Sequence, residues 1–324
     1  MNTHSKHSDD PQNASDFNQR YRYKVGGSLA WNDSTYIPRQ GDSDLYQAIQ
    51  SGAFCHVLGP RQVGKSSLRI RTSYRLRQAG YCCASVQATE LGGAQRTLKF
   101  WDKQLISLIW DSLHPEASEV LLQWFKTTER LSAPQRLEHF VRDLIFADLR
   151  ETPIVIFIDE IDYLLDIPAI VSQFFSWIAK CYSLRTDYGA DYGADYGDYH
   201  EYHPLSFVIV GTAIATDLAG TAPACIDLFH SAQAIALDNF QLDQLQPLYS
   251  GLASIAQSPA ALPANLLAAI MHWTNGQPFL TQKLCHILFH RLQNMDPPLA
   301  LSPRALRYWI AQVIQLEIID FIGN

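Results

Sequence analysis

A run of eight residues has the types and spacing needed to hold a phosphate group. It fits the pattern G-x-x-x-x-G-K-[ST] and consists of Gly59, Pro60, Arg61, Gln62, Val63, Gly64, Lys65 and Ser66. Two glycines allow the loop to fold with its backbone N–H groups pointing toward a phosphate. Lys65 is expected to reach the β- and γ-phosphates, the Ser66 hydroxyl to coordinate Mg²⁺, and the Ser67 hydroxyl to hydrogen-bond a phosphate. The run therefore predicts a nucleotide-binding loop.

Two acidic residues follow an apolar run further along the chain. Residues 154–158 read IVIFI, which is typical of a strand buried on both faces of a parallel sheet, and Asp159 and Glu160 come directly after it. We expect Asp159 to hold Mg²⁺ and Glu160 to polarise a water molecule for attack on the γ-phosphate. The alternative for Glu160 is an exposed acid at a helix start. Asp162 is interpreted as a supporting or helix-capping residue.

Thr212 occupies the corresponding place after another apolar run. Residues 207–210 read FVIV and are followed by Gly211 and Thr212. Polar groups at strand ends line the ligand crevice of open α/β sheets. Thr212 is therefore a candidate sensor of the γ-phosphate, with an ordinary turn residue as the alternative.

The elements that must position these residues alternate between strand and helix. Strands are predicted at 54–58, 82–87, 154–158, 207–210 and 232–237, and helices at 42–51, 65–78 and 168–184. Residues 97–150 look helical, with breaks near Pro115 and Pro134, and their tryptophans are expected in the core. From about residue 242 the pattern is helical only. We predict an α/β domain, residues 23–240, with a parallel sheet flanked by helices, and a smaller all-helical domain, residues 241–324.

Two segments stand outside this pattern. Residues 1–22 are polar and are expected to form a disordered tail. Residues 186–203 read TDYGADYGADYGDYHEYH, a repeat that offers no core face. It is interpreted as a low-complexity surface insertion, and a regulatory or partner-binding loop is the alternative.

Composition narrows the class of protein. The 324 residues are 47% hydrophobic and 18% charged, with a formal net charge of −7, so a strongly basic nucleic-acid binder is not favoured. No apolar run approaches the ~18 residues that a membrane span requires. The six cysteines form no C-x-x-C pair and are expected to be buried thiols in a reducing compartment. We therefore expect a cytoplasmic protein with no membrane partner.

The phosphate loop and its flanks resemble a known family. Together with Asp159-Glu160 and the strand before Thr212, they are similar to P-loop NTPases that carry an additional strand and a catalytic glutamate. More narrowly, the chain resembles the AAA-like domain of bacterial, largely cyanobacterial, proteins in the STAND group of signalling ATPases. The likeness covers residues 21–320 and is most specific at 23–29 (YKVGGSL), 36–40 (YIPRQ), 57–68 (VLGPRQVGKSSL) and 273–281 (WTNGQPFLT).

The resemblance implies ATP as the nucleotide and a helical lid domain after the sheet. It implies that Arg39 lies near the adenine, and that Pro278, in Gly276-Gln277-Pro278, packs on the base. From the residues alone, Pro278 is a helix stop and restart. Such proteins usually continue into a winged helix and a repeat or effector module, so Asn324 would lie within or just after the first helix of that region.

Three functions are consistent with these residues. The leading hypothesis is an Mg·ATP-dependent regulatory switch with slow hydrolysis, acting through an unidentified protein partner or through self-association. The second is a DNA-associated ATPase, such as an initiator or transposition helper, because residues 61–77 hold six cations and no acids. The third is an ATP-binding scaffold that does not hydrolyse the nucleotide.

Overall fold

The computed structural model describes residues 23–92, 100–149, 152–165, 167–186, 205–212, 223–254, 262–294 and 302–319. The predicted tail, 1–22, and nearly all of the repeat at 186–203 lie outside these residues. The chain divides into two compact units. One comprises Arg39–Asp238, and the other comprises Asn239–Asn324 with the stretch that ends at Pro38.

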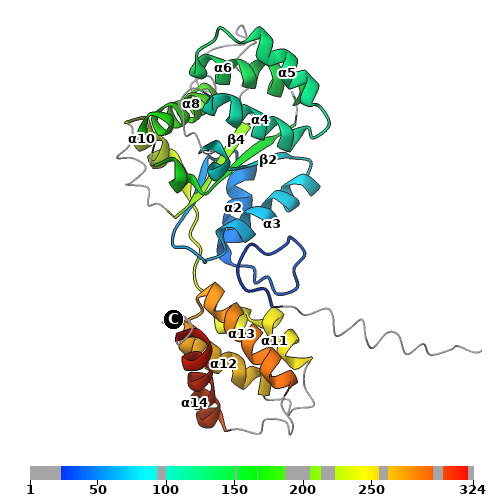
Figure 1. Ribbon diagram of the computed structural model, residues 1–324, viewed down its shortest axis with the longest axis vertical. Coiled ribbons are helices and arrows are strands. Elements are labelled where there is room, and N and C mark those ends of the chain that lie inside the picture. Colours follow the sequence, from blue (N-terminus) through cyan, green and yellow to red (C-terminus); the bar gives the residue numbers. More distant parts are fainter. Residues whose placement is uncertain are drawn as a thin grey trace, which may run out of the picture. The chain divides into compact units, whose positions relative to one another are not determined.

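The larger unit is built on a parallel sheet (Figure 1). In the described part of the chain its order is β2-β3-β4-β1-β5, and every neighbouring pair is parallel. The strands are β1 (Cys55–Leu58), β2 (Cys82–Gln87), β3 (Ile154–Asp159), β4 (Leu205–Gly211) and β5 (Gln233–Ala234). Every residue of β3 and β4 is buried, as expected for strands covered on both faces. The predicted α/β class is confirmed.

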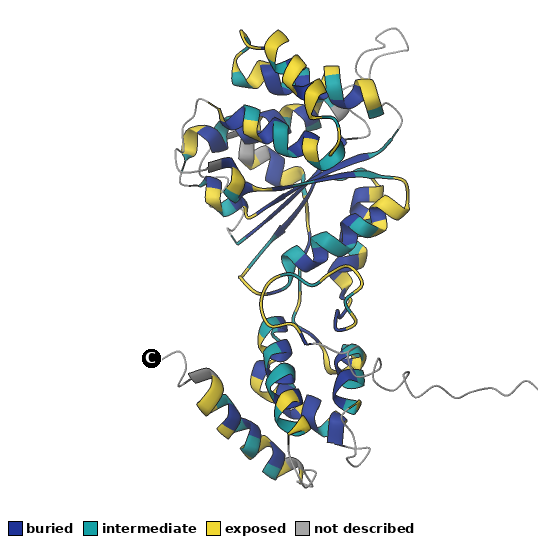
Figure 2. Ribbon diagram, turned by 45° about the vertical axis from the view of Figure 1, so that its right-hand side comes forward, coloured by how far each residue is buried: buried dark blue, intermediate teal, exposed yellow. Residues whose placement is uncertain are grey.

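Helices cover both faces of this sheet (Figure 2). On one face, α2 (Gln40–Gln50) and α3 (Lys65–Gln78) pack on alternate residues of the central strands through a core that includes Leu45 and Leu68. On the other face lie α4 (Trp101–Leu113), α6 (Ala133–Phe140), α8 (Pro168–Thr186) and α10 (Pro223–Ser231). The alternation of the strand side chains sends one set to each core, which fixes the strand register.

The helical region between β2 and β3 has the breaks that the prolines predict. Helix α4 ends before Pro115, α5 spans Ser118–Thr127, and Pro134 lies in the first turn of α6 behind the N-cap Ser132. Two short elements, η2 (Val141–Ile145) and α7 (Phe146–Leu149), complete the region. The Arg136 guanidinium forms a buried ion pair with Asp102 of α4, so α4 and α6 are held together by charge as well as by packing.

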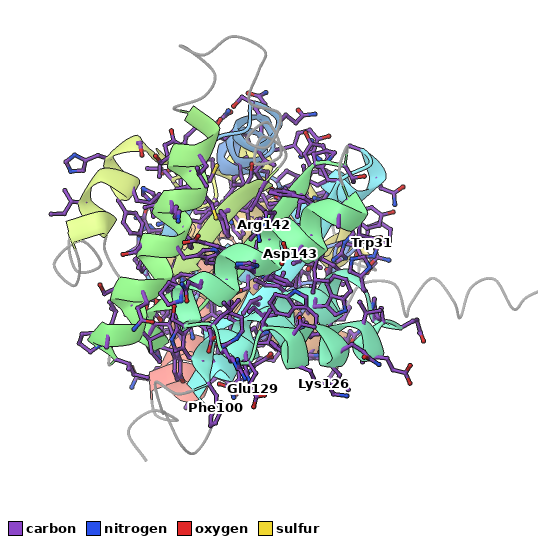
Figure 3. All side chains as sticks on the ribbon, turned by 90° about the horizontal axis from the view of Figure 1, so that it is seen from above. Trp31, Phe100, Lys126, Glu129, Arg142 and Asp143 are labelled. Atoms are coloured by element: carbon purple, nitrogen blue, oxygen red, sulfur yellow. The ribbon has the colours of Figure 1, made fainter. Side chains whose placement is uncertain are left out.

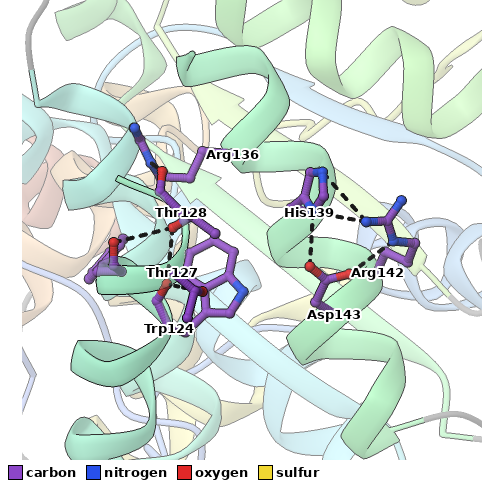
Figure 4. Close-up of polar contacts among 8 residues, drawn as sticks. Trp124, Thr127, Thr128, Arg136, His139, Arg142 and Asp143 are labelled. Carbon is purple, nitrogen blue, oxygen red and sulfur yellow. Dashed lines mark hydrogen bonds and ion pairs between the residues drawn. The ribbon is translucent and has the colours of Figure 1, made fainter. Parts of the chain in front are cut away.

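Polar contacts also join α5 to α6 (Figure 4). The Thr128 hydroxyl donates to the Trp124 carbonyl (3.1 Å), and the Arg136 Nε donates to the Thr128 carbonyl (3.3 Å). His139, Arg142 and Asp143 form a separate exposed cluster, in which His139 Nδ1 lies 2.9 Å from an Asp143 carboxylate oxygen.

Most aromatic side chains of this region belong to the core, whereas Phe100 is exposed. Trp101, Trp110 and Trp124 are buried, as predicted, and Phe125 is half-buried. Charged side chains of the region, including Lys126, Glu129, Arg142 and Asp143, lie at the surface (Figure 3). The four buried cysteines of the described residues behave as apolar side chains, since burial raises the pKa of Cys55 to about 12 and that of Cys83 to about 11.

The smaller unit is helical and includes a segment that the sequence does not place there. Its helices are α11 (Gln246–Ala253), α12 (Leu262–Thr274), α13 (Pro278–Gln293) and α14 (Pro303–Ile314). Tyr23 and Ile37 are buried in their core, the Tyr23 hydroxyl donates to the Leu248 carbonyl (2.6 Å), and the Gln282 amide donates to the Thr35 carbonyl (2.9 Å). Residues 23–38 therefore belong with the helical unit, because Tyr23 and Ile37 share its apolar core and the segment hydrogen-bonds to α11 and α13.

Candidate nucleotide-binding site

The predicted phosphate loop connects β1 to α3. Gln62 (φ 66°) and Gly64 (φ 91°) adopt left-handed backbone conformations, which let the chain turn sharply before the helix begins at Lys65. The Gly59 N–H donates to the Gly211 carbonyl (3.1 Å), which anchors the loop to the end of β4. Pro60 and Arg61 are exposed, whereas Val63 and Ser67 are buried.

Lys65 lies across the loop and close to the predicted acids. Its ammonium donates to the carbonyls of Gly59 (2.8 Å) and Pro60 (2.6 Å). Burial lowers the pKa of Lys65, and the nearby Asp162 and Asp159 carboxylates oppose that shift. The structure thus brings the loop lysine and the two acids, about a hundred residues away in the sequence, into one electrostatic environment.

Asp159 is buried at the carboxyl end of β3. One carboxylate oxygen accepts the Glu160 backbone N–H (2.9 Å), and the other accepts the Arg69 Nε (3.0 Å). The Asp159 side chain is 6% exposed and that of Arg69 is 12% exposed. Arg69 is a site residue that sequence reasoning missed. Its position four residues after Lys65 puts both on one face of α3, and that spacing is the signal that points to it.

Glu160 projects from the same strand end. Its side chain is exposed, and its backbone is left-handed (φ 59°), a conformation that non-glycine residues adopt rarely. The 3₁₀ turn Ile161–Leu164 follows it directly. This geometry keeps Glu160 out of the core and accessible to water, and its role as the water-activating group stays a prediction.

Asp162 connects the ends of two neighbouring strands. Its carboxylate accepts the backbone N–H of Thr212, the residue after β4. Gly211 makes this approach possible, since a Cβ there would lie 2.6 Å from the Asp162 carboxylate and 2.6 Å from the Ile161 side chain. Asp162 therefore supports the backbone of the candidate sensor Thr212, which stands beside the loop anchored to Gly211.

Replacing Gly211 with Ala is expected to destabilise the α/β unit by ~2 kcal/mol, because the added methyl group must displace backbone or side-chain atoms in a packed strand end. Urea unfolding followed by circular dichroism measures the change. Gly59→Ala is the matched control, since a Cβ at Gly59 would meet no atom within 4 Å. Equal stability of the two variants would show that the Asp162–Thr212 contact is loose.

Arg39 lies against the backbone of the phosphate loop. Its Nη1 donates to the Val63 carbonyl (2.8 Å) and to the Asp238 carbonyl (3.2 Å), and the side chain is buried. A Cβ at Gly64 would stand 3.0 Å from the Arg39 Nη2, so the guanidinium packs directly on the loop. A position beside the adenine, which the resemblance implies for Arg39, stays a prediction.

Pro278 belongs to the helical unit. Helix α12 ends at Thr274, Asn275 and Gly276 take left-handed conformations, and Pro278 is the first residue of α13. The Phe240 N–H donates to the Gly276 carbonyl (2.8 Å), so this turn also holds the segment that enters the unit. The helix stop and restart is confirmed, and contact with a nucleotide base stays a prediction.

The residues at the strand ends fit a hard divalent cation. Mg²⁺ prefers oxygen ligands and is usually held by one or two carboxylates and substrate phosphates. The buried Asp159 carboxylate and the half-buried Ser66 hydroxyl supply such oxygens at the carboxyl edge of the sheet and at the start of α3. These are the residues that would hold the ion.

Comparison with known proteins identifies the family to which the chain belongs. The model of the AAA-like domain family matches residues 25–300, and the chain belongs to this family. An uncharacterized WD repeat-containing protein of Synechocystis sp. is 39% identical over 298 residues. That match covers 92% of this chain and 23% of the Synechocystis protein, so the chain spans about a quarter of this longer relative.

Solved structures share the fold at low sequence identity. The Walker-type ATPase PABY2304 of Pyrococcus abyssi matches with a TM-score of 0.53 and 14% identity, over 93% of this chain and 78% of that one. The ORC2 protein of Aeropyrum pernix, solved as ADPNP–ADP complexes, matches with a TM-score of 0.54 and 14% identity, over 89% and 73%. These likenesses show a P-loop ATPase fold.

Proposed function

We propose that this protein is an ATP-dependent regulatory switch of the STAND type that hydrolyses Mg·ATP slowly. One observation carries the proposal. The Lys65 ammonium of the phosphate loop interacts electrostatically with the Asp159 and Asp162 carboxylates, where the loop follows β1 and the acids lie at the carboxyl end of β3 or just after it. Parallel α/β sheets bind ligands at this edge. The nucleotide complexes of the ORC2 protein, which has a similar fold, support ATP as the ligand.

In the proposed reaction each residue has a separate task. The loop N–H groups and the positive end of α3 hold the phosphates, and Lys65 turns from the Gly59 and Pro60 carbonyls to the β- and γ-phosphates. Glu160 orients and deprotonates the attacking water, and Thr212 senses the γ-phosphate. Mg²⁺, when bound at Asp159 and Ser66, would neutralise the charge that develops on the phosphate oxygens.

Switching requires that the nucleotide site be connected to the rest of the chain. Arg39 provides a connection, because its guanidinium binds both the loop at Val63 and the carbonyl of Asp238. Arg39 and Asp238 are the first and last residues of the α/β unit, where the chain passes to the helical unit. A change in the conformation of the phosphate loop on hydrolysis would therefore be transmitted by the Arg39 side chain to both points at which the chain leaves the α/β unit. The partner that reads this change is a protein or a second copy of the chain.

The arginines of α3 bear on the alternative of a DNA-associated ATPase. Arg69 pairs with Asp159, the Arg75 guanidinium lies over the Tyr46 ring (4.1 Å to the centroid), and Arg77 donates to the Cys83 carbonyl (2.8 Å). Three of the six cations of residues 61–77 thus make contacts within the α/β unit, which leaves them less available to DNA phosphates. This observation favours the switch over DNA binding.

The location of the protein stays part of the proposal. Within the described residues, no helix combines the length and the hydropathy that crossing a bilayer requires. The cytoplasm is inferred from the cysteine usage, and binding to a membrane forms no part of the proposed function.

Release of phosphate from Mg·ATP by the purified chain tests the proposal. We expect turnover well below the ~1–10³ per second usual for enzymes and nearer the ~10⁻⁴ per second of unaided switch GTPases, with loss of turnover in EDTA. Turnover of ~10 per second or more would favour a working ATPase. ATP binding without any release would favour the scaffold, and salt-sensitive DNA binding at physiological ionic strength would favour the DNA-associated alternative.

A further inference from the structure

The contact between Arg69 and Asp159 joins three elements of the α/β unit. Arg69 lies on α3 and its Nε donates to the Asp159 carboxylate at the end of β3 (3.0 Å). Its Nη1 donates to the Ser85 hydroxyl on β2. One guanidinium therefore bridges the helix that follows the phosphate loop and the two strands at one edge of the sheet.

The Arg69–Asp159 ion pair is strengthened by its burial. A carboxylate that is 6% exposed has lost most of its hydration and needs a compensating positive charge. Arg69 supplies that charge through a charge-assisted hydrogen bond, and Ser85 holds the guanidinium in place from its other side. The remaining Asp159 oxygen accepts the Glu160 N–H, so both carboxylate oxygens are engaged by groups of the protein itself.

We propose that Arg69 is a built-in counter-ion that competes with Mg²⁺ for the Asp159 carboxylate and so sets the metal concentration at which the site loads. This inference rests on the proposed function. A guanidinium bound to the Asp159 carboxylate repels a divalent cation that approaches the same group, so the Arg69 contact and Mg²⁺ binding weaken each other. The Ser85 hydroxyl retains the guanidinium near its place during that competition. Arg69 is thus a positioning residue that raises the Mg²⁺ concentration at which ATP binding tightens.

Calorimetric titration of ATP into the protein at a series of buffered free Mg²⁺ concentrations tests the inference. For Arg69→Met, the free Mg²⁺ that gives half of the metal-dependent gain in ATP affinity is expected to fall about tenfold, the scale of one charge-assisted hydrogen bond. Arg69→Lys, which keeps a cation but not the planar fork, is expected to give an intermediate value. Ser85→Ala is a milder change that removes one hydrogen bond to the guanidinium, and it is expected to lower the Mg²⁺ midpoint about threefold.

Arg77→Met is the matched control, because Arg77 lies on the same helix and donates to the Cys83 carbonyl instead of to a carboxylate. Its Mg²⁺ midpoint is expected to equal that of the parent chain. An unchanged or higher midpoint for Arg69→Met and Ser85→Ala, in proteins whose thermal unfolding is cooperative, would overturn the inference while leaving ATP binding in place. Absence of ATP binding by the parent chain, with and without Mg²⁺, would instead overturn the proposed function.

Discussion

Replacing Lys65 with Ala is expected to weaken ATP binding at least ~100-fold and to remove hydrolysis with it. Lys65 is the cation that lies across the phosphate loop, with its ammonium held by the Gly59 and Pro60 carbonyls. Hydrogen bonds to charged groups contribute ~1.5–3 kcal/mol each, and the lysine is expected to bind two phosphates. Calorimetric titration of Mg·ATP measures the affinity.

The control for Lys65 is Lys180→Ala. Lys180 lies on α8 and its ammonium pairs with the exposed Glu138, remote in sequence from the loop. Its removal is expected to leave ATP affinity within ~2-fold of the parent, since exposed ion pairs contribute little. ATP affinity of Lys65→Ala within tenfold of the parent would contradict a nucleotide site at this loop, provided that both variants unfold at similar temperatures.

Replacing Glu160 with Gln is expected to lower phosphate release ~100-fold or more while ATP stays bound. Glutamine retains the shape of the side chain but cannot accept the proton of the attacking water, and such proton transfer contributes ~10²–10⁴-fold to rates. The exposed side chain and the left-handed backbone of Glu160 set it at the end of β3 without any role in packing, so the fold should tolerate the change. Single-turnover phosphate release and calorimetry measure the two effects separately.

The control for Glu160 is Glu138→Gln, an acid on α6 that pairs with Lys180. It is expected to release phosphate at the parent rate. Equal rates for Glu160→Gln and the parent would mean that Glu160 is only an exposed acid at the start of a turn, and another group would have to activate water. Loss of ATP binding together with hydrolysis would mean that Glu160 supports the site structurally.

These two variants separate the contribution of each residue to ATP binding from its contribution to hydrolysis. The comparison therefore distinguishes a switch from a non-hydrolysing scaffold. A switch needs both steps, with slow hydrolysis ending the ATP state. A scaffold needs binding only, so Lys65→Ala would act on it and Glu160→Gln would not. The match covers only 23% of the Synechocystis protein. What such a switch would control in a protein of that length therefore remains part of the proposal.

The sequence by itself determined the parts of this protein that depend on neighbouring residues. Helix α3 and strand β2 have the bounds that periodicity predicts, and the phosphate loop lies between a strand and a helix as its glycines and Lys65 require. Local patterns report these features because backbone preference and side-chain alternation act over a few residues. The repeat at 186–203 offers no such pattern, and its role stays a prediction.

The tertiary structure decided everything that depends on residues far apart in the chain. It packs residues 23–38 on the helical unit, sets Arg69 against Asp159, and joins Asp162 to the Thr212 backbone. Arg69 looks like one cation among several on α3 until the parallel pairing of β2 with β3 puts Ser85 and Asp159 beside it. Local sequence does not distinguish which of several cations on α3 will face a given acid. The long-range pairing of the strands decides this, and here it determines which charged side chains surround the candidate site.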